Sequence, residues 1–275
     1  MRLRSVLFVP AINARAVEKA RTLDCDAVVL DLEDAVGPED KDAAREAARG
    51  ALAQDFAGKT VAVRVNGLDT PWGEADLEAV GKADTVVLPK VADAATLAAA
   101  RAALGSRPVW AMIETCRGVL NAAGIAAAEG VEALILGQND LAAEMRCRPG
   151  ADRGPLWSAM GAIVTAARAH GRVALDGVYN AFQDAEGFEA ECRQGRAFGF
   201  DGKTLIHPKQ IDICNRVFSP SEAEVAWSKA VIEAFQLPEN QGRGAIRVEG
   251  RMAELLHLGQ AERLVAVAEA IREQA

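Results

Sequence analysis

The sequence predicts an α/β fold, a (β/α)8 TIM barrel with a C-terminal helical extension. Short apolar runs rich in β-branched residues alternate along the chain with alanine-rich segments of helical spacing. Continuous apolarity is typical of strands that are buried on both faces of a parallel sheet. Eight such runs within about 210 residues favour a closed barrel over an open, doubly wound sheet.

The expected elements follow one another in order. Strands are expected at residues 6–9, 27–32, 61–65, 85–88, 109–113, 133–136, 173–175 and 203–206, and helices at 93–104, 118–128, 156–170 and 184–198. A helix at 221–235, a loop at 238–250 and a last helix at 253–273 should follow. We assign residues 1–219 to the barrel and 220–275 to an extension. Since the extension is too short to have a core of its own, we expect it to pack on the barrel or on a neighbouring subunit.

The composition excludes several classes of protein. The chain has 275 residues, a formal charge of −8 and a pI of about 5.1, so we expect no nucleic acid and no membrane among its partners. Its apolar runs are shorter than the roughly 18 residues of a membrane span. The five cysteines are scattered and odd in number, which argues against a disulfide framework and predicts a cytoplasmic protein.

Polar side chains follow the expected strands at the end where TIM barrels carry their chemistry. They include Asp31, Glu33 and Asp34 after the second strand, Lys90 after the fourth, Glu114 after the fifth and Asp140 after the sixth. Mg²⁺ typically takes one or two carboxylates and leaves its other positions to water and substrate. We therefore predict that Glu114 and Asp140 bind one Mg²⁺. The alternative is that acids in these loops cap the next helix, an interpretation that also suits Asp34 and Asp184.

Arg64 ends an otherwise apolar run and needs an anionic partner, because an unpaired buried charge is costly. That partner is either a substrate carboxylate or a neighbouring acid such as Glu33. Two familiar cofactor signatures are absent. No G-x-G-x-x-G follows the first strand, and the three histidines are too dispersed for a zinc triad.

Several segments, in order over nearly the whole chain, resemble the citrate lyase beta subunit and malyl-CoA lyase family of the HpcH/HpaI aldolase superfamily. They are 4–10 (RSVLFVP), 27–36 (AVVLDLEDAV), 64–66 (RVN), 88–90 (LPK), 113–115 (IET), 137–141 (GQNDL), 199–203 (GFDGK) and 206–208 (IHP). The specificity comes mainly from the LDLEDAV block at 30–36, the IET segment and the ND segment, which are spaced as in that family.

The resemblance implies a Mg²⁺-dependent carbon–carbon lyase. Such an enzyme cleaves or forms a 3-hydroxyacyl-CoA, for example malyl-CoA, citramalyl-CoA or citryl-CoA, with an acyl-CoA and a 2-oxo acid as the other reactants. Carried over by position, the site consists of Glu114 and Asp140 as metal ligands, Arg64 and Glu114 as substrate ligands, Arg64, Asp31 and Glu33 as catalytic residues, and Asp34 and Lys90 as their supports.

The resemblance also implies a homo-oligomer, often a trimer, in which the C-terminal segment completes a neighbouring subunit's site. The family carries an acid/base aspartate in a C-terminal G-x-M-V-D block. Here the segment is GRMAE at 250–254, so Glu254 stands at that position. We place Glu254 at the start of the last helix as a candidate catalytic acid/base. The alternative is an acid in a first helical turn, stabilised by the helix dipole.

Two other functions remain open. A CoA-free aldolase for 2-oxo-3-deoxy acids would share the metal and the arginine. A subunit of a citrate lyase complex would receive its acyl group as a thioester on a carrier protein. The basic residues Arg15, Lys19 and Lys41 near the first loops either contact CoA or lie on solvated helix faces.

Overall fold

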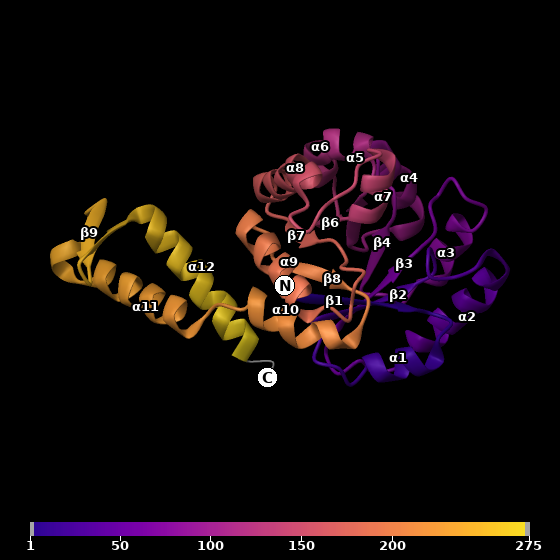
Figure 1. Cartoon of the computed structure of the whole chain (residues 1–275), viewed down its shortest axis with the longest axis horizontal. Coiled ribbons are helices and arrows are strands. Elements are labelled where there is room, and N and C mark those ends of the chain that lie inside the picture. The colour runs from indigo at the N-terminus through magenta and orange to yellow at the C-terminus, as the bar shows by residue number, and fades with distance from the viewer. Residues whose placement is uncertain (1–2, 273–275) are drawn as a thin grey trace. The chain divides into compact units, whose positions relative to one another are not determined.

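Eight parallel strands close into a barrel in the computed structural model, which describes residues 3–272 (Figure 1). The strands are β1 (Ser5–Pro10), β2 (Ala27–Asp31), β3 (Thr60–Arg64), β4 (Thr85–Leu88), β5 (Val109–Ile113), β6 (Val131–Leu136), β7 (Val173–Asp176) and β8 (Gly202–Leu205). Because β1 pairs with both β2 and β8, the sheet has no free edge. The predicted TIM barrel is confirmed, and each expected apolar run overlaps one strand.

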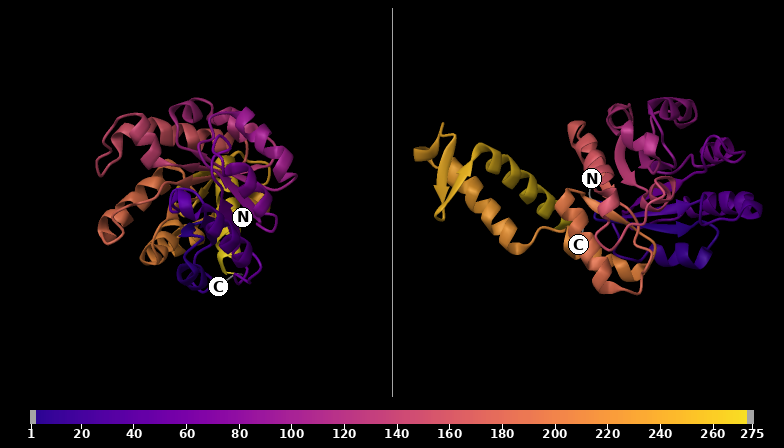
Figure 2. Two further views of the ribbon diagram at one scale, coloured as in Figure 1. Left: turned by 90° about the vertical axis from the view of Figure 1, so that its right-hand side faces the viewer. Right: turned by 45° about the horizontal axis from the view of Figure 1, so that its top comes forward.

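Helices lie around the outside of the strands (Figure 2). They are α1 (Ala14–Ala20), α2 (Lys41–Ala51), α3 (Gly73–Ala79), α4 (Ala94–Leu104), α5 (Cys116–Leu120), α6 (Ala122–Ala127), α7 (Gln138–Glu144), α8 (Trp157–Ala169), α9 (Ala185–Phe198) and α10 (Ile211–Phe218). No helix within residues 3–272 is long and apolar enough to cross a membrane.

Along each strand, successive side chains point in turn to the barrel interior and to the surrounding helices. One buried cluster, which includes Val29, Ala62 and Trp110, fills the interior. A larger cluster joins the opposite faces of the strands to the helices. Burial on both faces explains why the strands are continuously apolar. By the same alternation Arg64 lies on the face of Ala62, so β3 ends with a cation at the interior of the barrel.

One expected helix is broken into two, and one of two expected helix caps is present. Residues 118–128, expected as one helix, form α5 and α6, because Asn121 leaves the helical conformation and its amide donates to the Ala92 carbonyl at 2.9 Å. Asp184 caps α9 by accepting from the Gly187 N–H, as predicted. Within the described chain Asp34 caps no helix, and its carboxylate instead lies 3.2 Å from Arg64 Nη1.

The described chain divides into a barrel unit, Leu3–Phe218, and a C-terminal unit that begins at Ser219. The C-terminal unit contains α11 (Glu222–Gln236), β9 (Ala245–Val248), β10 (Arg251–Glu254) and α12 (Leu255–Arg272). We expected no core in this extension, but it has a hydrophobic cluster of its own, formed by Val231, Ile246, Val248, Ala253 and Ala261.

The hairpin of β9 and β10 corrects two predictions. Residues 238–250 were expected as a loop, whereas β9 lies within them and pairs antiparallel with β10. Glu249 and Gly250 form the two-residue turn with φ values of 47° and 82°, the left-handed conformation that such hairpin turns require. Our placement of Glu254 at a helix start was therefore wrong, since Glu254 is the last residue of β10. The expected helix end, Glu273, lies outside the described residues.

Candidate active site

A cavity of about 340 Å³ opens at the carboxyl ends of the barrel strands. Five residues singled out in the sequence line it, namely Asp31, Asp34, Arg64, Glu114 and Asp140. They converge because parallel strands all end at the same mouth of the barrel. The cavity also contains Phe8 and Met112, which the sequence did not point to. Each lies two residues after a residue of the interior cluster on the same strand. The alternation along the strands could therefore have revealed both.

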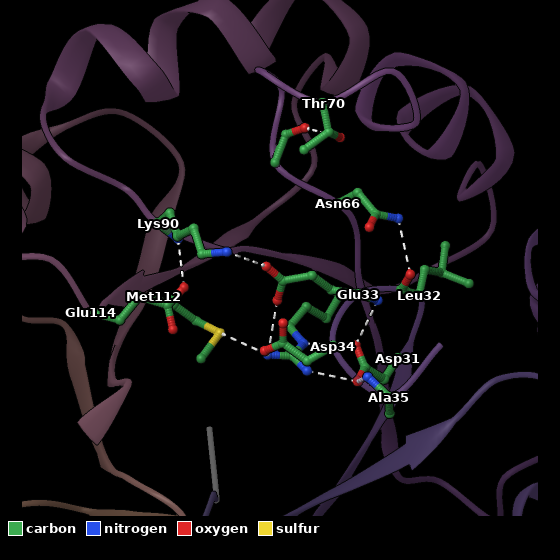
Figure 3. A network of polar contacts seen from close by, with 12 residues as sticks. Asp31, Leu32, Glu33, Asp34, Ala35, Asn66, Thr70, Lys90, Met112 and Glu114 are labelled. Atoms are coloured by element: carbon green, nitrogen blue, oxygen red, sulfur yellow. Dashed lines mark hydrogen bonds and ion pairs between the residues drawn. The ribbon is translucent and has the colours of Figure 1, made fainter. Parts of the chain in front are cut away.

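Arg64 lies beside three acids at the mouth of the barrel. Figure 3 shows these acids, Asp31, Glu33 and Asp34, close to one another. Arg64 Nε and Nη2 donate to the two carboxylate oxygens of Asp31 at 2.7 and 2.6 Å. Its Nη1 lies 2.9 Å from Glu33 and 3.2 Å from Asp34. Burial disfavours the charged guanidinium, but the bonds and charges of these acids outweigh burial and raise the pKa of Arg64. A neighbouring acid therefore pairs with Arg64, as one of our alternatives held, and Asp31 is the main partner.

Glu33 is a buried carboxylate with an unsatisfied oxygen. Its Oε2 lies near Arg64 Nη1, but the contact lacks hydrogen-bond geometry, and this atom has no other partner among the described residues. Burial raises the pKa of Glu33 to about 7, although the charge of Arg64 opposes the shift. Lys90 Nζ lies 3.4 Å from the other carboxylate oxygen of Glu33. At neutral pH the Glu33 carboxylate can therefore either accept or donate a proton.

Hydrogen bonds from the backbone and from Lys41 hold the segment that carries Asp31 and Glu33. Asp31 accepts from the N–H groups of Glu33 and Ala35 at 3.0 and 3.2 Å. Lys41 is buried, and its Nζ donates to the carbonyls of Leu32 and Glu33, each at 2.8 Å. Lys41 therefore lies on no solvated helix face. It supports the acidic segment, a role that the sequence analysis did not foresee.

Glu114 follows β5 and is almost fully buried. Its Oε1 accepts from the Lys90 N–H at 2.7 Å, and Lys90 has the left-handed φ of 51°. Gly137 makes room for Glu114, because a Cβ there would lie 2.3 Å from its Oε2. Burial and then the charge of Glu33 raise the pKa of Glu114 to about 8, and the charge of Asp140 adds to this. The position of Glu114 therefore suits a cation.

Asp140 lies in the first turn of α7 and faces the same cavity. The helix begins after Gly137, and no side chain caps it. Across residues 3–272 the Asp140 carboxylate makes no hydrogen bond or ion pair. The capping alternative is therefore not observed for Asp140, and its carboxylate is available to a ligand.

The donor set fits a magnesium ion. No group of three or more His, Cys, Asp or Glu side chains in the described part of the chain is arranged to hold a metal. Two carboxylates, Glu114 and Asp140, face one cavity, and the unsatisfied Glu33 Oε2 lies close to it. Mg²⁺ is commonly held by one or two carboxylates, with water and substrate as the remaining ligands. Two carboxylates, the number that Glu114 and Asp140 offer, would thus be enough to hold Mg²⁺ at this cavity.

Comparison with known proteins places the chain in a family. The family model for HpcH/HpaI aldolase/citrate lyase matches residues 4–208, which include the whole cavity. The chain belongs to this family. The family resemblance seen in the sequence is therefore confirmed.

Three relatives and one solved structure are similar to this chain over nearly its whole length. A (3S)-malyl-CoA thioesterase of Cereibacter sphaeroides is 49% identical over 98% of this chain and 95% of that protein. The citrate lyase subunit beta of Leuconostoc mesenteroides is 35% identical over 97% and 93%, and an L-malyl-CoA/beta-methylmalyl-CoA lyase of C. sphaeroides is 35% identical over 98% and 95%. CitE of Mycobacterium tuberculosis, in complex with magnesium, acetoacetate and coenzyme A, matches with a TM-score of 0.82 and 34% identity over 98% of both chains. The family therefore contains magnesium-binding members, in agreement with the Mg²⁺ prediction.

Glu254 belongs to the C-terminal unit and not to the barrel unit that forms this cavity. Its N–H donates to His257 Nδ1 at 2.9 Å. Its side chain is exposed and has no ion pair or hydrogen bond within the part of the chain that the structure describes. The carboxylate is therefore free to act elsewhere, and its role as acid/base stays a prediction.

Proposed function

We propose that this protein is a Mg²⁺-dependent enzyme that acts on a 3-hydroxyacyl-CoA of the malyl-CoA type. The names of the thioesterase relative and of the lyase relative both contain malyl-CoA. The thioesterase is 49% identical to this chain over nearly its whole length. This observation carries the proposal. The paired carboxylates and the buried arginine at the barrel mouth support it, because such a substrate presents a carboxylate, a hydroxyl group and a thioester.

In this proposal three residues that line the cavity, together with Glu33 beside Arg64, each have a role. Glu114 and Asp140 hold the metal, which supplies Lewis-acid polarisation of substrate oxygens when it is bound. Arg64 orients the substrate carboxylate through Nη1, because Asp31 occupies its Nε and Nη2. The substrate then takes the place of Glu33 and Asp34 as the partner of Nη1. Glu33 is the acid/base residue of the barrel unit, close to Arg64 and Lys90.

We propose hydrolysis of the thioester as the first candidate for the net reaction. The higher identity to a thioesterase than to the two lyase-type relatives favours it. The carbon–carbon cleavage predicted from the sequence is the second candidate, and the family model favours it. Hydrolysis of malyl-CoA releases free CoA and malate, whereas cleavage releases acetyl-CoA and glyoxylate.

One assay separates these reactions. The purified protein is incubated with malyl-CoA and Mg²⁺, and samples are divided between a thiol reagent for free CoA and phenylhydrazine for the 2-oxo acid. Thiol without hydrazone supports hydrolysis, and hydrazone without thiol supports cleavage. Neither product with malyl-CoA, citramalyl-CoA or citryl-CoA would contradict the substrate class. Product from a CoA-free 2-oxo-3-deoxy acid, or only from a carrier-protein thioester, would favour the other two functions considered above.

We also propose that the enzyme is a cytoplasmic homo-oligomer in which Glu254 completes the site of a neighbouring subunit. The position of Glu254 in the GRMAE segment and its exposed, unpaired carboxylate support this proposal. A trimer is the expected assembly. The five cysteines are free thiols, which suits a reducing compartment.

A further inference from the structure

Arg153 is a buried cation in the loop between α7 and α8. Its side chain is only 2% exposed, although connecting segments usually lie at the surface. It adopts a left-handed φ of 53°, which is uncommon for residues other than glycine, asparagine and aspartate. Its guanidinium nitrogens donate to three elements: Nε to Gln194 of α9 at 2.7 Å, and Nη1 to Asp176 of β7 at 2.7 Å and to Gln138 of α7 at 3.0 Å.

A charge-balanced cluster holds Arg153 in place between the barrel wall and α9. Asp176 is fully buried on the helix-facing side of β7. Its Oδ2 lies 2.8 Å from Lys203 Nζ, which is also 2.7 Å from Glu191. The cluster therefore contains two cations, Arg153 and Lys203, and two acids. Each charge has an opposite partner at short range, and these pairs hold Arg153 in position. Within the described residues its Nη2 is buried without a hydrogen-bond partner.

Gln138 links this cluster to the cavity. Its Oε1 accepts from Arg153, and its Nε2 donates to the Val178 carbonyl at 2.5 Å, so both ends of the amide are engaged. Gln138 and Val178 both line the cavity. The loop after β7 approaches closely, because a Cβ on Gly177 would lie 3.0 Å from Gln138 Cγ. Gln138 is thus fixed on two sides.

Gln138 is the first residue of α7, and Asp140 lies two residues later in the same turn. Asp140 has no side-chain partner of its own in the described chain, so the turn that carries it sets its direction. We propose that Arg153 is a positioning residue, which fixes the first turn of α7 through Gln138 and thereby sets the spacing of the Asp140 and Glu114 carboxylates for Mg²⁺. This inference rests on the metal site of the proposed function.

The test measures Mg²⁺ binding to the metal-free protein by titration calorimetry, with no substrate present. We expect Arg153→Met to raise the Kd for Mg²⁺ roughly tenfold, the lower end of the range for residues that orient metal ligands. Saturating Mg²⁺ should restore most of kcat, because the ligands themselves remain. Arg153→Lys should give an intermediate Kd, since an ammonium group cannot reproduce the fork that reaches Gln138, Asp176 and Gln194.

Arg4→Met is the matched control. Arg4 is also buried and pairs through Nε and Nη2 with Asp26, at 3.0 and 2.9 Å, but it does not line the cavity. Its loss should lower the Tm and leave the Kd for Mg²⁺ unchanged. Gln138→Leu is a second test, for use if Arg153→Met does not fold. It removes the same link from the cavity side and should weaken Mg²⁺ binding to a similar extent.

The outcomes distinguish this inference from the proposed function. Wild-type affinity for Mg²⁺ in both Arg153→Met and Gln138→Leu would overturn the positioning role and leave the metal site intact. An equal rise in Kd in Arg4→Met would also overturn it, because general destabilisation would then explain the effect. Failure of the wild-type protein to bind Mg²⁺ would overturn the metal site and the inference together.

Discussion

Arg64 donates to both oxygens of Asp31, and its remaining nitrogen lies beside Glu33 and Asp34. The planar guanidinium therefore contacts acids along two of its edges. A lysine would keep the charge and lose this geometry. Hydrogen bonds to charged groups are worth roughly 1.5–3 kcal/mol, so we expect Arg64→Lys to lower kcat/KM about tenfold to hundredfold. Steady-state kinetics measure this effect, with calorimetry to check the fold. Wild-type kinetics in a folded variant would make Arg64 purely structural.

Asp140 provides the sharper test of the metal site, because no other side chain of the described residues depends on it. Asp140→Asn keeps the size of the residue and removes the anionic ligand. We expect weaker Mg²⁺ binding and lower activity to appear together, while the Tm without metal changes little. Titration of activity against Mg²⁺ concentration measures both effects. An unchanged metal dependence would show that Asp140 is not a ligand.

At the scale of elements, the turn of the β9–β10 hairpin depends on two left-handed residues. A Cβ on Gly250 would meet open space, so the cost of Gly250→Ala comes only from its φ of 82°. We expect a loss of about 1–2 kcal/mol, the usual penalty of the left-handed conformation for a residue with a Cβ. Amide hydrogen exchange in 245–254 should become faster, while exchange in the barrel strands stays constant. Glu249→Gly relieves the same strain and should not accelerate exchange.

The buried ion pairs between β7, β8 and α9 predict how stability depends on pH. Burial alone would raise the pKa of Asp176, but Lys203 and then Arg153 outweigh it and hold the pKa below its usual range. The folded value thus lies below the unfolded value of about 3.9. This contribution is fully present above that value and is lost as the pH falls through the folded value. The Tm should therefore fall as the pH drops below about 4.

Asp176→Asn tests this origin of the acid sensitivity. Breaking one partner of a buried pair typically costs about 3–5 kcal/mol at neutral pH. The variant should also show a flatter dependence of Tm on pH below about pH 4, because it has no carboxylate to protonate at this position. Asp201→Asn, at a partly exposed pair with Arg168, is the matched control and should cost no more than about 1 kcal/mol. A steep fall that persists in Asp176→Asn would place the acid sensitivity elsewhere.

The elements also show what the sequence can predict and what it cannot. The barrel strands were predictable because burial on both faces makes them continuously apolar. The gathering of Asp31, Asp34, Arg64, Glu114 and Asp140 at one cavity was predictable because parallel strands bring their ends together. The β9–β10 hairpin was missed because each strand has only four residues and its turn, Glu249–Gly250, is not one of the common Asn-Gly or Asp-Gly pairs. The role of Arg153 was missed because its partners Gln138, Asp176 and Gln194 are distant in sequence, and a polar loop gives no local sign of burial.

At the scale of the whole molecule, the division into two units raises the question of which subunit supplies Glu254. The barrel unit contains the entire cavity, and the C-terminal unit has its own hydrophobic cluster and carries Glu254 on β10. A catalytic role for Glu254 therefore requires a C-terminal unit, from the same chain or from a neighbour, to contribute to the cavity of a barrel unit. Glu254→Gln should abolish turnover of malyl-CoA and leave Mg²⁺ binding intact. For the cleavage reaction, it should also abolish proton exchange at the acetyl-CoA methyl group.

Subunit mixing decides between the two arrangements. Glu254→Gln and Asp140→Asn proteins, each inactive alone, are combined in equal amounts under conditions that allow subunits to exchange. If Glu254 acts on a neighbour, a barrel unit from the first variant can meet a C-terminal unit from the second, and random assembly should restore about one quarter of wild-type activity. If Glu254 acts within its own chain, every site retains one defect and no activity returns. A fully active Glu254→Gln protein would remove Glu254 from the mechanism and leave the acid/base chemistry to Glu33 of the barrel unit.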